Sequence, residues 1–424
     1  MERTQKQPRT SQPFSLSTII PQRTTGRNAS WDPTPDVRAA LSRFGASSDW
    51  TDALSLHCSA LAAVGEGRAR DGYDALSEAV SPFLKLFRDA PDAWLVEPLV
   101  GLATSLWLAA AAADVAASGN GGGGAPPGGA RLGSAGAGGS GAASTKALES
   151  CGAVLQRCFA ASMQGGGPPG AAGPSKKDAA LSLVVTLFRV YFALNTLRLS
   201  KNLINAVNSR QFPPLASFPR GQVVAYQYFT GRLALFDEDY AAADAALGAA
   251  FDACPPSAAA NRARLAFFLI PVRLLRGVLP SASLLKTYGL NAEYGPIVEA
   301  VKTGGVGGLD RALEGRQWAY IKAGTYLLLD KLRFAVARRL IKRVAILHAA
   351  ADPARAAQLP LASIATALAW QGAPSDPDAV ECLVANLIFR RYVKGYLAHR
   401  SGVLVLSKAD PFPPLSGVAL ADPV

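Results

Sequence analysis

The chain has 424 residues, half of them hydrophobic, and a formal net charge of +12 with an isoelectric point near 9.6. This length is enough for two or three compact units, and the excess of cations favours a polyanionic partner: nucleic acid, a membrane surface or an acidic protein. The five cysteines and three histidines are widely spaced, so the sequence offers no zinc-site pattern and predicts reduced, buried thiols.

The N-terminal third predicts helices interrupted by low-complexity segments. Residues 1–30 carry cations but no long apolar run, so we expect a disordered basic tail and not a signal peptide. Helical repeats are expected over residues 31–215, with disordered Gly-rich inserts at 118–144 and 164–175, because such compositions bury too little apolar surface to fold. The apolar run Leu99–Ala117 predicts a buried helix, and a membrane span is the less favoured alternative.

The middle of the chain predicts stacked helical pairs. Asp178–Val207 reads as one long apolar helix or as two. Residues 226–255 place Gly231 on a first helix, acidic residues at Asp237–Asp239, and apolar residues three or four apart on a second helix. A small residue lets two helices approach closely, and this spacing is typical of tetratricopeptide-like (TPR-like) hairpins, which need stacked neighbours. We therefore expect a TPR-like solenoid over residues 216–332.

Residues 333–410 predict a winged helix. Three helical patterns are followed by "KGYLA" and "GVLVLSK", two strands that turn at "HRSG", where Gly402 supplies a positive φ. Either Asp376 or Asp378 can cap the third helix. The fold class predicted is thus all-α, a helical solenoid followed by a winged helix with a small β-hairpin.

Residues 411–424 predict a C-terminal strap. We expect Phe412 and Leu415 of "DPFPPL" to pack on the winged helix. The alternative is a proline-rich ligand, because prolines pre-set an extended conformation.

This order of units resembles PCI domains, and three motifs carry the resemblance further. "FLIPVRLLRGVLP", "ANLIFRRYVKGYLAH" and "SKADPFPPL" are similar to motifs of the PCI domain-containing protein two family. The similarity covers roughly Asp178 to Leu415, and the two Gly-rich inserts depart from the family pattern.

The resemblance implies a non-enzymatic scaffold and nucleic-acid-binding subunit of a nuclear complex that couples transcription to mRNA export. The partners that it implies are a GANP-type PCI scaffold protein, a small acidic Sem/DSS-type protein, RNA or DNA bound through phosphates, and nuclear pore components. It implies a nuclear location at the nucleoplasm and pore, compatible with a cytoplasmic pool, without membrane, cofactor or metal. The rival interpretation is a PCI subunit of a signalosome-like or proteasome-lid-like complex that binds protein only.

Two basic clusters mark the candidate nucleic-acid site. They contain no carboxylate and lie in the winged helix or just before it, in a fold that can present its third helix and wing to nucleic acid. We expect phosphate contacts with little base readout and a strong dependence on salt. His399, at the wing tip, is expected to contact phosphate and not to act as a base. The candidate residues are Arg338, Arg339, Lys342, Arg343, Arg390, Arg391, Lys394, His399, Arg400 and Lys408.

Candidate partner-binding residues fall in two places. Val403 and Val405 lie on the hairpin, where apolar side chains of both parities predict that a second face, with the strand edge, meets the scaffold. A cationic, aromatic groove for the acidic protein is expected from Lys286, Arg316, Trp318 and Lys322.

Aromatic residues and one cysteine complete the sequence-based expectations. Trp318, Tyr320, Tyr326 and Trp370 could stack on bases, but their helical spacing beside leucines favours core positions. Cys382 is expected to be an inert, buried thiol, and the sequence shows no catalytic constellation.

Overall fold

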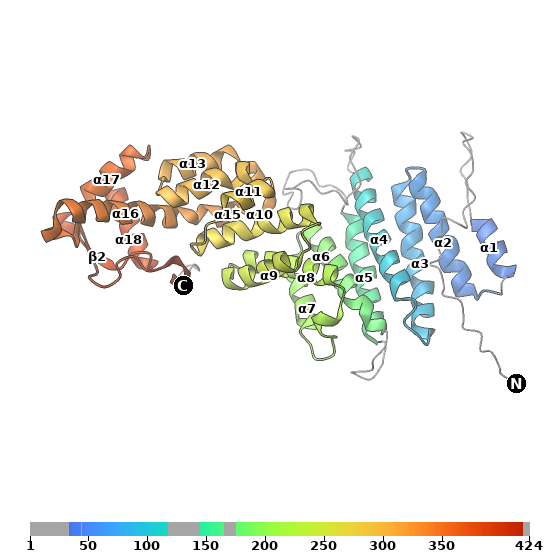
Figure 1. Ribbon diagram of the computed structural model, residues 1–424. Coiled ribbons are helices and arrows are strands. Elements are labelled where there is room, and N and C mark those ends of the chain that lie inside the picture. The colour runs from blue at the N-terminus through green and yellow to red at the C-terminus, as the bar shows by residue number, and fades with distance from the viewer. Residues whose placement is uncertain (1–33, 44, 118–144, 165–174, 419–424) are drawn as a thin grey trace.

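A computed structural model describes residues 34–43, 45–117, 145–164 and 175–418. The predicted basic tail and nearly all of both Gly-rich inserts lie outside these residues. The molecule is elongated, with the N-terminal helices at one end and the winged helix at the other (Figure 1). Its buried residues form three successive hydrophobic cores along the chain.

The first core is built by antiparallel helices and part of α8. The helices before α8 are α1 (Thr34–Arg43), α2 (Ser48–Gly65), α3 (Ala69–Asp89), α4 (Val96–Ala117), α5 (Lys146–Gln164), α6 (Ala180–Ala193) and α7 (Leu197–Val207). By length and composition, the helical stretch Ala93–Ala117 could cross a membrane. Its buried residues, however, belong to the first core, and α4 packs against α3, α5 and α6 as a core helix does.

The long apolar segment predicted over residues 178–207 is two helices. The break comes after Ala193, where Asn195 has a φ of 56°. Asparagine tolerates this left-handed conformation better than most residues, so the chain can end α6 here and begin α7. The turn leaves α7 free to pack its buried Ser200, Leu203 and Val207 inward.

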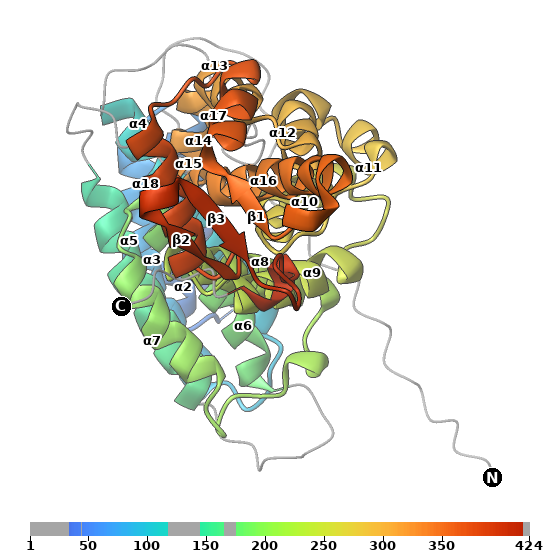
Figure 2. The same ribbon diagram turned by 90° about the vertical axis from the view of Figure 1, so that its left-hand side faces the viewer.

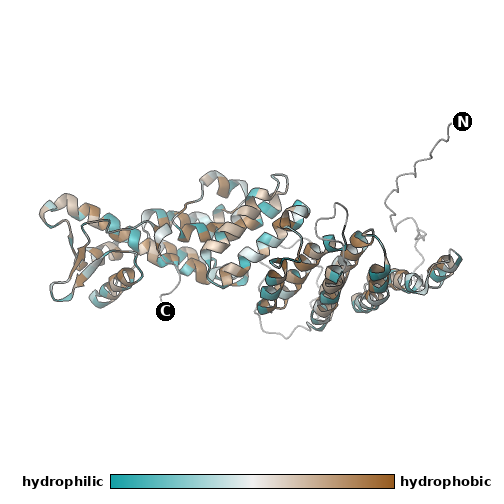
Figure 3. Ribbon diagram, turned by 90° about the horizontal axis from the view of Figure 1, so that it is seen from below, coloured by the Kyte–Doolittle hydropathy of each residue, from teal (hydrophilic) through white to brown (hydrophobic). Residues whose placement is uncertain are grey.

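The second core lies in the TPR-like part. Its elements are α8 (Arg220–Phe236), α9 (Tyr240–Ala253), α10 (Ala259–Leu275), α11 (Ala282–Thr287), α12 (Asn291–Thr303), α13 (Val306–Gly315), α14 (Gln317–Ala323) and α15 (Tyr326–Asp330). Figure 3 shows apolar stretches, in brown, alternating with polar ones along these helices.

The predicted helical hairpin is confirmed as α8 and α9. A Cβ atom added at Gly231 would lie 2.6 Å from Cγ of Leu247, so only glycine permits this approach of the two helices. Asp239 caps α9 by accepting a hydrogen bond from the backbone N–H of Ala242 at 2.9 Å.

One buried arginine joins the first two cores. The guanidinium of Arg232, on α8, lies 4.6 Å from the ring centroids of both Phe192 and Phe268. Phe192 packs on the first core and Phe268 belongs to the second, and Arg232 is 3% exposed. Cation–π contacts therefore replace an ion pair at the junction.

The winged helix holds the third core. Its elements are α16 (Leu332–Ala351), β1 (Gln358–Pro360), α17 (Leu361–Trp370), α18 (Pro377–Phe389), β2 (Gly395–Ala398) and β3 (Val403–Leu406). The cap of α18 is Asp376, which accepts from the N–H of Ala379 at 2.6 Å, and Pro377 follows at the first helical position. Gly402 has a φ of 60° at the hairpin turn, as expected.

The sheet is larger than the predicted hairpin. β1 joins it, in the antiparallel order β1-β3-β2, with Leu404 opposite both Leu359 and Leu397 (Figure 2). Because β3 is the central strand, the strand that bears Val403 and Val405 offers no edge to a partner, and the edge of the predicted hairpin is that of β2. The free edges belong to β1 and β2.

The C-terminal strap ties the winged helix to the solenoid. Phe412 and Val418 are buried in the third core, with Leu415 packed against it. A Cβ atom at Gly277, after α10, would lie 3.0 Å from that of Leu415. Two sequence motifs far apart in the chain, "PVRLLRGVLP" and "PFPPL", thus meet in space.

Candidate partner and nucleic-acid interface

The outward face of the wing is apolar. In the register of the sheet, Leu404 and its partners point into the core, so Tyr396, Val403 and Val405 lie on the opposite face. Val403 and Val405 are half-buried, whereas Tyr396 is 62% exposed. The two predicted partner-binding valines therefore share a surface with an aromatic side chain.

Cations stand at both ends of this face. Arg391 and Lys408 lie at its base and Arg400 at its tip, all exposed. Along the described chain none of the three makes a side-chain hydrogen bond or ion pair. A four-residue strand at roughly 3.3 Å per residue separates base and tip by about 13 Å. Such a row suits the phosphates of an extended strand.

Arg391 occupies a position that favours glycine. It follows α18 with a φ of 62°, while the N–H of Tyr392 donates to the carbonyl of Leu387 at 2.8 Å. That bond closes a Schellman motif, in which the left-handed residue is usually glycine. A cation is held here at a conformational cost of about 1 kcal/mol.

The cluster on α16 serves the fold more than the sequence suggests. Arg338 is 8% exposed and donates to the carbonyls of Tyr392 at 3.2 Å, Phe412 at 3.0 Å and Pro413. Burial, reinforced by the nearby charge of Arg339, lowers the pKa of its guanidinium. Arg338 anchors the strap, and its prediction as a nucleic-acid contact is wrong.

Two further arginines of α16 cap a neighbouring helix. Arg339 donates to the carbonyl of Lys302 at 3.2 Å and Arg343 to that of Thr303 at 2.7 Å, at the C-terminal end of α12. Cations are favoured there because carbonyls of the last turn lack helical partners. Both side chains remain exposed, and half-buried Lys342 lies between them in sequence.

Acids from other elements neutralise part of the basic surface. Lys331 pairs with Glu238 at 2.6 Å, Arg333 pairs with Asp330 and Asp310, and Lys394 lies 3.3 Å from Asp410. Although burial opposes its charge, hydrogen bonds to Glu238 and Tyr240 raise the pKa of Lys331.

Arg390 stacks on the core of the winged helix. Its guanidinium lies 4.5 Å from the ring centroid of Phe334, which in turn stacks on Tyr392. Burial raises the pKa of the Tyr392 hydroxyl. Arg390 is half-buried, so it offers less of its surface to a ligand than Arg391 does.

The wing tip meets an acidic start of α18. Nδ1 of His399 lies 2.7 Å from Oε1 of Glu381, so this nitrogen is occupied although the ring is exposed. Asp376, Asp378 and Glu381 make the first turns of α18 negative, which disfavours phosphate there.

Cys382 lies next to this acidic turn and is exposed, so its prediction as a buried thiol is wrong. Its place on the outer face of α18 explains the error, because only one side of that helix packs inward.

A second exposed surface lies on α14 and α15. Trp318 is 79% and Leu327 75% exposed, with Ile321 and Lys322 on the same helix as Trp318 also exposed. The core interpretation is wrong for Trp318 and for Trp370, which is 85% exposed, whereas Tyr320 is buried and donates to the carbonyl of Glu293 at 2.6 Å. Tyr326 is half-buried.

The cations proposed for the groove differ in availability. Arg316 pairs with Glu293 at 2.9 Å, whereas Lys286 on α11 and Lys322 on α14 are exposed. The side chains exposed on α14 and α15 are therefore less cationic and more apolar than the sequence suggests.

Three exposed side chains were missed as candidates: Phe389, Tyr396 and Leu327. Alternation within "KGYLA" could have marked Tyr396, since Leu397 must face the core. Phe389 and Leu327 carry no such signal. Among the residues with described positions, no group of three or more His, Cys, Asp or Glu side chains could hold a metal ion.

Comparisons with known proteins agree with this geometry. The family model described as "PCI domain" matches residues 317–408, which include the whole winged helix. "Enhanced ethylene response protein 5" of Arabidopsis thaliana is 39% identical over 274 residues, 65% of this chain and 64% of that protein. "PCI domain-containing protein 2 homolog" of Dictyostelium discoideum is 36% identical over 268 residues, 63% of this chain and 60% of that protein.

A longer alignment links the chain to "Protein CSN12 homolog" of Mycosarcoma maydis, at 33% identity over 386 residues, 87% of this chain and 82% of that protein. A helical solenoid that ends in a winged helix, with this family match, defines a PCI-domain protein. The chain belongs to the PCI domain-containing protein 2 family, as the recurrence of that description among its relatives shows. Its first relatives are aligned over about three fifths of their length.

Proposed function

We propose that the chain is a non-enzymatic scaffold subunit that binds nucleic acid in a nuclear complex coupling transcription to mRNA export at the pore. The observation that carries this proposal is the wing, whose apolar outer face is flanked by the exposed cations Arg391, Arg400 and Lys408, which have no ion-pair partner among the described residues. Apolar atoms suit a protein partner and rim cations suit phosphates, so one small element supports both tasks.

The scaffold partner would dock on the face that bears Tyr396, Val403 and Val405. We expect a GANP-type PCI protein there, and its cations would extend the positive surface. The Val403→Asp and Val405→Asp double variant should lose the scaffold, because two carboxylates would be buried at the interface. Arg400→Glu should retain the scaffold and bind nucleic acid more weakly.

Affinity purification from nuclear extract, followed by mass spectrometry, tests the partner. We expect the wild-type chain to recover a PCI scaffold of mRNA export, with nuclear pore components. The result is negative if only signalosome or proteasome-lid subunits appear, or if the double Asp variant recovers the scaffold stoichiometrically while keeping the wild-type melting temperature. One observation favours the signalosome-like alternative, in which the chain binds protein only. Arg338, Arg339 and Arg343 donate hydrogen bonds to backbone carbonyls of the fold, so fewer cations are available for phosphates.

A small acidic protein of the Sem/DSS type would bind the surface of Trp318, Leu327 and Lys322. Exposed aromatic and aliphatic side chains beside a lysine fit a disordered acidic chain that folds on binding. Trp318→Ala should reduce its recovery in the same purification. Trp370→Ala removes an equally exposed tryptophan elsewhere and should leave recovery unchanged.

A further inference from the structure

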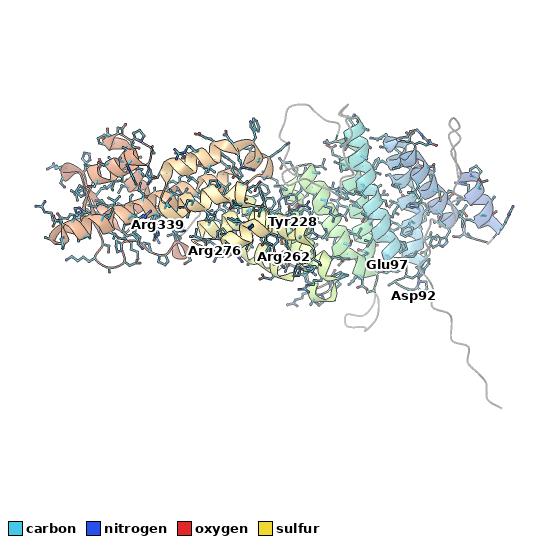
Figure 4. The ribbon with its side chains drawn as sticks, turned by 45° about the horizontal axis from the view of Figure 1, so that its top comes forward. Asp92, Glu97, Tyr228, Arg262, Arg276 and Arg339 are labelled. Carbon is cyan, nitrogen blue, oxygen red and sulfur yellow. The ribbon has the colours of Figure 1, made fainter. Side chains whose placement is uncertain are left out.

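A pocket of about 580 Å³ lies in the N-terminal helical part, far along the chain from the wing. Three segments form it: the first turns of α4, the 3₁₀ turn Lys176–Ala179 and the segment that leads into α8. The lining residues are Val96, Glu97, Val100, Gly101, Asp178, Ser217, Phe218, Pro219 and Gln222. In Figure 4, Glu97 and Asp92 are labelled at this end of α4.

The charged groups of the pocket are two carboxylates, those of Glu97 and Asp178. Glu97 is exposed and makes no hydrogen bond or ion pair within the described chain. Asp178 accepts one bond, from the N–H of Ser175 at 2.9 Å, which leaves its other oxygen available. Oε1 of Gln222 is closed off from solvent and lacks a partner among the described residues. The groups that the pocket presents to a ligand are thus its two carboxylates, because the Gln222 oxygen is closed off.

No cation lines the pocket, although the chain as a whole is basic. The nearest lysines in sequence are engaged elsewhere. Lys176 donates to the carbonyl of Arg88 at 2.9 Å, and Lys177 to that of Gln211 at 3.1 Å. The carboxylates are therefore not neutralised by their own neighbours.

The remaining walls are apolar and open. Val96, Val100, Phe218 and Pro219 supply aliphatic and aromatic surface. Gly101 has no atom within 4 Å of a Cβ that might be added, so the helix leaves space at this point. A ligand that fits must combine several N–H donors with an apolar stem.

We propose that this pocket binds an arginine side chain within an extended, basic segment of a protein partner. A guanidinium carries five N–H donors in a planar fork that can bridge two carboxylates, and its methylene stem packs on apolar walls. Lysine offers a single compact charge and would use only one carboxylate well. The pocket volume lies within the range of ligand pockets in proteins, about 300–1,000 Å³.

The proposal is tested by fluorescence anisotropy with the full chain and a labelled Ala-Arg-Leu-Arg-Ala peptide, compared with the same peptide carrying citrulline. Citrulline keeps the shape and removes the charge. We expect at least tenfold tighter binding of the arginine peptide and a tenfold loss in Glu97→Gln. Gly101→Leu, which should fill the open space without a clash, should abolish binding while the circular dichroism spectrum stays unchanged.

Glu78→Gln is the matched control, because Glu78 is an exposed glutamate of α3 outside the pocket, and it should bind as the wild type does. Equal affinity for the citrulline peptide, or unchanged affinity in both Glu97→Gln and Gly101→Leu, would overturn the proposal. If deletion of residues 1–30 instead raises the affinity for the arginine peptide, the natural occupant is the basic tail of this chain and the partner assignment is wrong.

Discussion

At the residue scale, a substitution at Arg391 distinguishes most clearly between effects on stability and effects on nucleic-acid binding. Glycine would relieve the left-handed backbone but remove a cation from the base of the wing. We predict that Arg391→Gly raises the free energy of unfolding by about 1 kcal/mol and weakens nucleic-acid binding severalfold. Urea unfolding and anisotropy on one preparation would measure both. A variant that is less stable, or that binds unchanged, would contradict this account of Arg391.

The arginines of α16 show what a sequence alone cannot tell. Consecutive residues on a helix point about 100° apart, so Arg338 and Arg339 face different surroundings. Which of them is buried depends on the strap, which lies more than seventy residues further along the chain. The charge of the cluster was predictable, whereas its division between anchoring and exposed arginines was not.

Thiol reactivity should single out Cys382. It is the only exposed cysteine of the five, all of which lie in described segments. Burial raises the pKa of Cys151 and of Cys158 to about 12, so their reactive thiolates are scarce at pH 8. Ellman's reagent should modify one thiol rapidly in the native protein and four more after unfolding. Cys382→Ser should abolish the rapid phase; more than one fast thiol would count against the buried positions.

Alkaline pH should destabilise the fold. Burial raises the pKa of Cys151 and Cys158 from 9.0, and of Tyr226 and Tyr320 from 10.0, to about 12. The folded chain keeps these protons while the unfolded chain loses them, so their stabilising effect is present below pH 9 and declines between pH 9 and 12. The urea concentration at the unfolding midpoint should therefore be lower at pH 10.5 than at pH 8. A constant midpoint would show that these groups are accessible.

At the element scale, the α8–α9 hairpin depends on Gly231. We predict that Gly231→Val destabilises the protein by about 2 kcal/mol, because the new side chain would collide with Leu247. Gly221→Ala, in the first turn of the same helix, meets no atom within 4 Å and should be neutral or stabilise by up to about 1 kcal/mol. Thermal unfolding of the two variants compares them directly. Equal effects would mean that the helices can move apart.

The helices were largely predictable and the sheet was not. Apolar spacing and caps marked α8, α9, α16, α17 and α18, and the acidic turn between α8 and α9 lies where it was expected. The strand β1 was missed because three residues ending in a proline carry no alternation that can be recognised. The apolar residues of both parities on β3 lie on its two faces: Leu404 and Leu406 fill the core, and Val403 and Val405 form the wing surface.

The exposed tryptophans have a similar explanation. Trp318 and Trp370 stand beside leucines and isoleucines in short helices, where a sequence pattern does not show which face lacks a neighbour. The structure leaves both outside the cores. Partner surfaces of this kind follow from the arrangement of helices and not from composition.

At the scale of the whole molecule, the three cores form one elongated body with chemically different ends. The N-terminal helical part offers a pocket with two carboxylates between α4 and the start of α8, and the far end of the molecule offers a basic wing (Figure 1). Arg232 joins the first two cores, and the strap joins α10 to the winged helix. Such links suit a subunit that holds several partners at fixed separations.

The salt dependence of nucleic-acid binding tests the central claim most directly. The measurement is the affinity of the full chain, alone and in its purified complex, for a labelled single-stranded RNA between 50 and 300 mM salt. It compares three proteins. They are the wild type, a triple wing variant with Arg391→Glu, Arg400→Glu and Lys408→Glu, and a triple control variant with glutamate at exposed Arg157, Arg198 and Arg210. If the wing binds phosphates, the wing variant should lose affinity and flatten the slope of log K against log salt by about 2, while the control keeps a near wild-type slope. Indistinguishable slopes for the two variants would contradict the wing as the nucleic-acid interface.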